Sequence, residues 1–413
     1  MKKQTQTSIN TRADFIWFII AVVMMSMIGI LSSDIYLPSM PYIANYFHVT
    51  YGAVQITITI YLIGLACFQL VYGPISDIYG RKPTLLLGLF IYIIASVFCT
   101  FSHSLLILLI ARFFQAIGAC SGLVIGRCIV SDLYDKKGTV RIFSIVLPFV
   151  AMSPAIAPVF GGYLQSFFGW RAAFACTILF GILLFAIVFY KIEETIIKKE
   201  KQFQKFNIKK VVFNNFQLIC LPSFRSYTFV VGSVYCGWFS YLAVSSHIYA
   251  SFNLSPSQVG YCYISQSLGS VLGSFTLKKV LDKLINSKII YIVFTINLIY
   301  ILIMYFIGSI NVLFFIISIT ITAFCNGIFL PLFIGCAMGS AADHKPQALG
   351  SASGLIGFIQ ISGGALGTVV VSLLPFTVHF LALALMMYTI FSCFIIYNME
   401  KSKTKRFKKT LNS

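Results

Sequence analysis

Charged side chains are scarce in this sequence. Asp, Glu, Lys and Arg together make up 10% of its 413 residues, and only 11 residues are acidic. Ordinary soluble domains carry about 25% charged residues, so this composition is too poor in charge for one. Apolar residues instead reach 59%, and the mean hydropathy is +0.91. We therefore predict an all-α membrane protein that crosses the bilayer many times.

The sequence also lacks the patterns of metal centres and redox sites. Its 11 cysteines form no C-x-x-C pair, and most lie in apolar runs, as Cys67 and Cys325 do, so we interpret them as small buried hydrophobes. We predict no enzymatic activity, no metal site and no cofactor, because the histidines show neither metal-ligand spacing nor a neighbouring acid. The five histidines are scattered over predicted loops and helix ends: His48, His103, His247, His344 and His379.

Basic residues outnumber acidic ones and give a formal charge of +19. They lie between and beyond the apolar blocks, where Lys and Arg act as topology signals, so no nucleic-acid partner follows from the charge. Of the 30 basic residues, all but Arg112, within a predicted span, and Arg171, between two spans, fall on one side. This asymmetry predicts that both termini are cytosolic.

The apolar segments divide the chain into two halves. In the first half we predict spans at 15–37, 52–72, 84–101, 105–126, 142–163 and 172–190. A span needs about 20 residues, so each of the three charge-free blocks that follow, 226–277, 289–342 and 346–399, holds two. The turns within these blocks are expected at Ser251–Pro256, at Gly308–Asn311 and near Pro375.

The predicted organisation is therefore twelve transmembrane helices in two six-helix bundles. The basic linker interleaves its charges with apolar residues, which predicts a segment lying partly along the inner membrane surface. The predicted parts are a cytosolic N-terminus at 1–14, the first bundle at 15–190, the linker at 191–225, the second bundle at 226–397 and a basic cytosolic tail at 398–413.

One short charged turn, GPISDIYGRKP at 73–83, separates two apolar segments of the first half. Its two glycines allow a sharp chain reversal, and Pro83 fits the start of the next helix because it loses no needed N–H there. The turn resembles the loop between helices 2 and 3 of the major facilitator superfamily, G-x-x-x-D-x-x-G-R-K. The resemblance implies that fold, with a binding site near the midplane between the halves. The matching residues are Gly73, Asp77, Gly80, Arg81 and Lys82.

Asp34 and Arg112 are the only ionisable residues, other than His, Cys and Tyr, that fall well inside predicted spans. A charge at the bilayer centre costs about 2.5–3.5 kcal/mol on insertion scales, so such residues usually face a cavity or each other and mark an ion or proton path. The alternatives are that Asp34 is an interfacial residue at the outer end of its helix, and that Arg112 belongs to a static ion pair.

The surroundings of both charges match a narrower group. SDIYLPSMP at 33–41 resembles the D-x-Y-L-P-x-x-P end of helix 1 in the bicyclomycin and chloramphenicol resistance (Bcr/CflA) group of drug/proton antiporters. RFFQAIGA at 112–119 is similar to the R-x-x-Q-G-x-G motif linked to proton transfer, with Ala116 replacing the first glycine. The resemblance implies that Asp34 binds proton or drug in turn, while Arg112 and Gln115 tune its proton affinity.

SPAIAPVFGG at 153–162 looks like the antiporter motif G-x-x-x-G-P-x-x-G-G, with Ser153 and Ala157 at glycine positions. Prolines kink a helix and a glycine pair lets another helix come close, so this segment suits a hinge or a leak-tight seam. A merely kinked structural helix is the alternative. The motif residues are Pro154, Pro158, Gly161 and Gly162, and the family's W-R and E-T pairs fall at Trp170-Arg171 and Glu194-Thr195.

The cytosolic charges predict a gate. We expect Asp77 at the N-terminus of the helix that starts near 349–351, where backbone N–H groups and the helix dipole favour an anion. We expect Arg81 to pair with Asp132 at the inner end of helix 4. These contacts would hold the cytosolic face shut and break when the halves rock. The gate residues are Gly73, Asp77, Gly80, Arg81, Lys82 and Asp132.

The second half offers aromatic and amide groups instead of fixed charge. A low-charge aromatic cavity suits uncharged or weakly polar amphiphiles of several shapes, although aromatic residues are so frequent that packing is the alternative. The possible cavity residues are Tyr235, Trp238, Tyr241, Gln266, Asn326 and Gln360.

These features predict proton-coupled efflux of small drugs or toxic amphiphiles across a bacterial inner membrane by alternating access. The alternative is a proton-coupled uptake symporter for a small metabolite, but a sugar or organic-acid site usually needs several polar groups and only Arg112 is at hand. The expected partners are a small-molecule substrate, protons and the lipid bilayer. We expect a monomer driven by the proton gradient.

Overall fold

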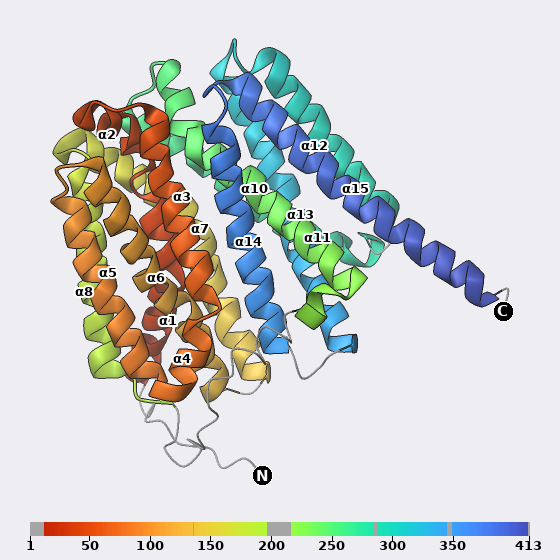
Figure 1. The fold of residues 1–413 in the computed structure, drawn as a ribbon, viewed down its shortest axis with the longest axis horizontal. Coiled ribbons are helices and arrows are strands. Elements are labelled where there is room, and N and C mark those ends of the chain that lie inside the picture. The colour runs from red at the N-terminus through yellow and green to blue at the C-terminus, as the bar shows by residue number, and fades with distance from the viewer. Residues whose placement is uncertain (1–11, 135, 196–215, 285–286, 345–348, 412–413) are drawn as a thin grey trace. The chain divides into compact units, whose positions relative to one another are not determined.

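The computed structural model describes residues 12–134, 136–195, 216–284, 287–344 and 349–411, and within these ranges its regular secondary structure is all helical (Figure 1). Twelve helices in these ranges have 19 or more residues, and ten of them are long and apolar enough to cross a membrane by length and composition. The predicted all-α fold with six long helices in each half is confirmed.

The first half contains six long helices and three short elements. The short elements are the 3₁₀ turn η1 (Leu37–Ser39), α2 (Met40–Phe47) and α4 (Tyr72–Tyr79). The long helices are α1 (Arg12–Asp34), α3 (Tyr51–Gln69), α5 (Arg81–Thr100), α6 (Leu105–Leu133), α7 (Lys136–Phe168) and α8 (Arg171–Lys191).

The second half contains the other six long helices. They are α10 (Pro222–Ser251), α11 (Pro256–Leu284), α12 (Ser287–Ile307), α13 (Val312–His344), α14 (Leu349–Ser372) and α15 (Val378–Leu411). The turns at 252–255, 308–311 and 373–377 lie where the charge-free blocks predicted them.

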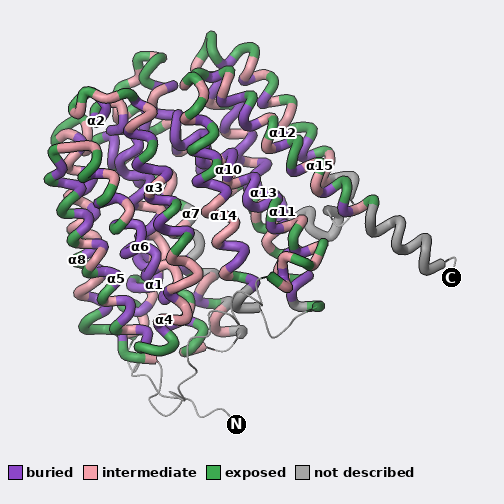
Figure 2. The backbone as a smooth tube through the Cα atoms, in the orientation of Figure 1, coloured by how far each residue is buried: buried purple, intermediate pink, exposed green. Residues whose placement is uncertain are grey.

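The chain forms two compact units. The first comprises 1–207 together with 255–261, the start of α11, and the second comprises 208–254 and 262–413. Their helices are buried on their inward faces and exposed on the outward ones (Figure 2). Exposed Leu, Ile and Phe side chains are expected on helices whose solvent is lipid.

The segment after α1 differs from the loop that we predicted there. It is helical, because proline is tolerated in the first turn of a helix, and η1 and α2 each carry a proline there. Helix α2 ends at Phe47 and is followed by His48, which has a left-handed φ of 53°. The hydroxyl of Thr50 then caps α3 by accepting a hydrogen bond from the Ala53 N–H at 3.4 Å.

The predicted spans 105–126 and 142–163 left a charged loop between them, and this loop is also not what the structure shows. Helix α6 continues to Leu133 and α7 begins at Lys136, so Arg127, Asp132 and Arg141 lie on helices, and Asp135 lies outside the described residues. Charged residues mark where a span leaves the hydrocarbon region, but Lys, Arg and Glu are good helix formers. Both helices therefore extend beyond the predicted membrane-spanning segments.

Glycines allow close helix contacts in both units. A Cβ at Gly118 of α6 would lie 2.5 Å from the Tyr92 nitrogen of α5. In the second unit, Gly273 of α11 packs against the carbonyl of Phe324 in α13, with only 2.0 Å left for a Cβ. Small residues commonly bring membrane helices together in this way.

Candidate functional site

The two intramembrane charges predicted from the sequence are both buried within the first unit. Asp34 is the last residue of α1 and is 3% exposed, and Arg112, in α6, is fully buried. The Ser33 hydroxyl donates a 2.6 Å hydrogen bond to Asp34 Oδ1. Asp34 is thus shielded by the protein within the first unit, at the end of its helix.

The guanidinium of Arg112 is held by two hydrogen bonds. Its Nη1 donates to the Ser32 carbonyl at 2.9 Å and to Gln115 Oε1 at 2.6 Å. Its Nε and Nη2 have no hydrogen-bond partner among the described residues. No ion pair between Arg112 and Asp34 is formed in that part of the chain, so the static pair weighed above is absent in this conformation.

Aromatic rings enclose Arg112 as well. Its Cζ lies 4.5 Å from the centroid of the Tyr36 ring and 4.0 Å from that of Tyr61 in α3. Both hydroxyls are engaged, Tyr36 with Thr57 at 3.0 Å and Tyr61 with the Gly29 carbonyl at 2.9 Å. A cation over an aromatic face gains about 2 kcal/mol when desolvated, so the rings partly replace water around the charge.

Gln115 extends the network to two further helices. Its Nε2 donates to the hydroxyls of Ser96 in α5, at 2.8 Å, and of Thr177 in α8, at 3.2 Å. The hydroxyls of Ser32 and Tyr92 lie 2.6 Å apart. Apart from Tyr36, which lies in a quoted motif, sequence reasoning missed these partners, and no pattern in the apolar spans distinguishes them.

A series of aromatic rings connects this site to Arg171. Phe174 contacts Tyr36 with ring centroids 5.4 Å apart, and Trp170 contacts Phe174 at 6.1 Å. The Arg171 guanidinium lies between Trp170 and Tyr46, 4.2 and 4.4 Å from their ring centroids. The W-R pair therefore joins α8 to α2.

The antiporter-motif residues lie on α7, which stays helical through Pro154 and Pro158. Gly161 abuts the carbonyl of Ile35, directly after Asp34, and a Cβ there would have only 1.7 Å of room. Gly162 abuts the Pro256 carbonyl of α11, and a Cβ at Gly162 would lie 2.4 Å from that carbonyl oxygen. The close approach of another helix is thus seen at Gly162, whereas Gly161 meets the turn beside the buried carboxyl. The role of this segment as a hinge or seam stays a prediction.

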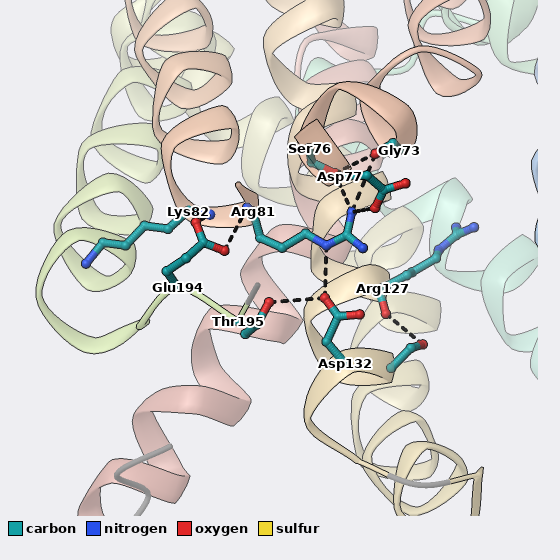
Figure 3. Close-up of polar contacts among 10 residues, drawn as sticks. Gly73, Ser76, Asp77, Arg81, Lys82, Arg127, Asp132, Glu194 and Thr195 are labelled. Carbon is teal, nitrogen blue, oxygen red and sulfur yellow. Dashed lines mark hydrogen bonds and ion pairs between the residues drawn. The ribbon is translucent and has the colours of Figure 1, made fainter. Parts of the chain in front are cut away.

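Arg81 is the centre of the charged turn (Figure 3). Its Nη1 lies 2.6 Å from Asp77 Oδ1, and its Nε donates to Asp132 Oδ2 at 2.9 Å. The predicted contact between Arg81 and Asp132 is thus confirmed. Thr195 also donates to Asp132, at 3.1 Å, and Arg81 Nη1 donates to the Ser76 hydroxyl at 2.6 Å.

Glu194 caps α5, a role that the E-T resemblance did not specify. Its two carboxylate oxygens accept the backbone N–H groups of Arg81, at 2.9 Å, and Lys82, at 3.2 Å. A carboxylate at a helix N-terminus is favoured by the unsatisfied N–H groups and the helix dipole. The Lys82 ammonium donates to the Phe189 carbonyl of α8 at 2.7 Å. Lys82 and Glu194 therefore join α5 to the end of α8.

Of the two glycines in this turn, only Gly80 has a backbone that requires glycine. Its φ is +103°, and a Cβ there would meet Glu194 Oε2 at 2.4 Å. Gly73 lies within α4 with open space around a potential Cβ, so our expectation that both glycines make the reversal is wrong for Gly73. The expected position of Asp77 beside 349–351 stays a prediction, since the side chains there lie outside the described residues.

The possible cavity residues of the second unit differ in their surroundings. Tyr241 is 2% exposed and packs in a tyrosine cluster, with its hydroxyl 3.1 Å from that of Tyr249. Asn326 lines a small cavity of about 20 Å³ together with Asn297 and Thr322. Gln266 is buried, and Tyr235, Trp238 and Gln360 are half-buried.

A family model of the Major Facilitator Superfamily matches residues 22–234 and 227–412. The chain belongs to this superfamily. It is 27% identical over 382 residues to the "Bicyclomycin resistance protein homolog" of Haemophilus influenzae, covering 92% of this chain and 94% of the relative. It is 37% identical over 146 residues, 35% of each protein, to a chloramphenicol resistance protein of Pseudomonas aeruginosa. The resemblance to the Bcr/CflA group is thereby confirmed.

Other superfamily proteins match in sequence or in fold. The uncharacterized MFS-type transporter YdgK of Bacillus subtilis is 32% identical over 257 residues, 62% of this chain and 63% of that protein. A bacterial homolog to the human lysosomal transporter Spinster, solved inward-facing and unoccupied, superposes with a TM-score of 0.70 at 16% identity, covering 94% of this chain and 96% of that one. This member of the superfamily is thus a membrane transporter.

Proposed function

We propose that this protein is a proton-coupled efflux transporter for small drugs that works by alternating access. Its relatives named for bicyclomycin, chloramphenicol and multidrug resistance support drug efflux. The observation that carries proton coupling is the buried carboxyl of Asp34 in the same unit as the buried cation Arg112.

In this proposal, Asp34 releases its proton when a drug binds and regains it when the drug leaves. The Arg112 guanidinium, fixed by Tyr36, Tyr61 and Gln115, stays in place through the cycle. Because the cation is fixed and unpaired with Asp34, it favours the ionised carboxyl without neutralising it permanently. The packing of Gly161 against Ile35 couples α7 to the position of the carboxyl.

The driving force is adequate for resistance. One proton moving through a potential of 100 mV supplies about 2.3 kcal/mol, which supports a drug gradient of roughly fiftyfold. No cofactor is needed for this exchange. The contacts of Arg81 with Asp77 and Asp132 hold the proposed cytosolic gate closed.

The test uses the purified full-length protein in proteoliposomes with an imposed pH gradient and chloramphenicol or bicyclomycin as the probe. Wild-type protein should move drug against its gradient, and a protonophore should stop it. Asp34→Asn should abolish coupled transport, because an amide cannot release a proton. The matched control is Asp14→Asn, the same change on the same helix at a residue that pairs with Lys191 at 3.6 Å.

The direction of flux separates efflux from the uptake alternative. An efflux antiporter should acidify the compartment that the drug leaves, whereas a symporter would move drug and proton the same way. Undiminished proton-coupled transport by Asp34→Asn would disprove the assigned role.

A further inference from the structure

Helices α10 and α15 pack against each other in the second unit (Figure 1). A groove lies on the surface where they meet. Its volume is about 330 Å³. One wall comes from the first two turns of α10, and the other comes from 391–399, before the basic end of α15. No residue of the buried Asp34 site or of the charged turn contributes to it.

The groove is polar at one end and apolar at the other. The two helices run in opposite directions (Figure 1), so the start of α10 lies beside the later part of the α15 wall. Arg225 and Ser223 of α10 and Asn398 of α15 supply the polar end. Phe229, Phe391 and Phe394 supply the apolar end and are 43%, 52% and 61% exposed. Aromatic side chains this exposed offer an apolar surface that suits an acyl chain.

Arg225 gives the polar end a positive charge. Its side chain is exposed, and none of the ion pairs in the described part of the chain involves it. The nearest acid along α15 is Glu400, which accepts a 2.8 Å hydrogen bond from the Tyr291 hydroxyl of α12. Among the described residues, no acid engages the guanidinium, so it can meet an anion. Arginine matches the oxygens of a phosphate by a bidentate contact.

We propose that this groove binds an anionic phospholipid. The phosphate contacts Arg225, with Ser223 and Asn398 as hydrogen-bonding neighbours, and an acyl chain lies along Phe229, Phe391 and Phe394. A soluble anion would leave the aromatic wall unused, and a zwitterionic head group would add its own cation beside Arg225. The order of polar and apolar residues along the groove matches the order of head group and chain in a lipid.

Native mass spectrometry of the full-length, delipidated protein tests this proposal. The probes are phosphatidylglycerol and phosphatidylethanolamine with identical acyl chains. Wild-type protein should bind the anionic lipid more tightly by about fivefold, because one basic residue near a membrane surface contributes roughly 1 kcal/mol. Arg225→Gln should remove this preference and Arg225→Lys should keep it.

Arg127→Gln is the matched control, since it removes an exposed arginine from α6 in the other unit and should leave the preference unchanged. Phe394→Ser should weaken both lipids equally, which separates the chain contact from the head-group contact. An elution profile and melting temperature like those of wild type show that each variant is folded. Equal binding of the two lipids by wild type would overturn the proposal, as would competition by inorganic phosphate at the lipid's own concentration.

Discussion

The two halves of this transporter stabilise their interiors differently. The three charged residues that are buried in the described part of the chain, Asp34, Arg81 and Arg112, all belong to the first half. The buried polar side chains of the second half are neutral, for example Asn297 and Gln266. Two units with the same number of long helices therefore need not share the same chemistry.

The difference lies in the groups that join the helices of each half. In the first half, Arg112 and Gln115 connect α1, α5, α6 and α8 through hydrogen bonds. In the second half, neutral groups join the helices, as where Gly363 of α14 packs against Gly232 of α10 and Asn297 donates to the Thr389 hydroxyl at 3.2 Å. A neutral interior can adjust to several substrates, whereas a charged one responds to protons.

The largest expected effect comes from removing the buried cation. Arg112→Met should reduce drug transport in proteoliposomes to background, because Gln115 and the Ser32 carbonyl lose their donor and Asp34 loses its neighbouring charge. The comparison variant is Asn297→Leu in the second half. It replaces a buried neutral amide by an apolar side chain of similar size, and it should retain most transport. Comparable losses of transport in both variants would show that the buried charge of the first half is no more important for transport than a neutral polar group of the second half.

Glycine contacts should matter in both halves. Gly118→Val and Gly273→Val should each lower the free energy of unfolding by about 1–3 kcal/mol, the cost of overpacking, because a Cβ has 2.5 and 2.0 Å of room at these positions. Thermal unfolding in detergent measures the change. Gly335→Ala is the control, since open space surrounds it on α13 and alanine favours a helix by roughly 0.5–1 kcal/mol.

The aromatic enclosure of Arg112 predicts a graded result at Tyr61. Tyr61→Leu should lower the initial rate of drug transport by about thirtyfold, since a desolvated cation–π contact contributes roughly 2 kcal/mol. Tyr61→Phe keeps the ring and loses only the bond to the Gly29 carbonyl, so its rate should fall by less than about threefold. Equal transport rates in the two variants would show that the contact between the Tyr61 ring and Arg112 does not contribute to transport.

The smallest effect is expected at the cap of α5. Glu194→Gln should lower the free energy of unfolding by about 0.5–1 kcal/mol, because a charged acceptor at a helix N-terminus becomes neutral. The difference from wild type, measured by thermal unfolding, should shrink in 1 M salt through screening. A difference that persists unchanged in salt would contradict the electrostatic part of the explanation.

The sequence was informative about the number of helices and about the charges, but less so about helix ends and neighbours. The turn at 308–311 follows from the length of a charge-free block, and the contact of Arg81 with Asp132 was expected from a motif. The contact of Tyr61 with Arg112 was not predictable, since a helix that is apolar all round gives no periodic signal for which face it buries. The helical segment 37–47 was missed because prolines suggest a loop when their place in the first turn is unknown.

The ring series from Tyr36 through Phe174 to Trp170 has a practical consequence. The chain has only three tryptophans, so replacing Trp17 and Trp238 by phenylalanine leaves Trp170 as the sole indole fluorophore. Its emission then reports, without any attached label, on rearrangements of the rings around Arg112 during turnover.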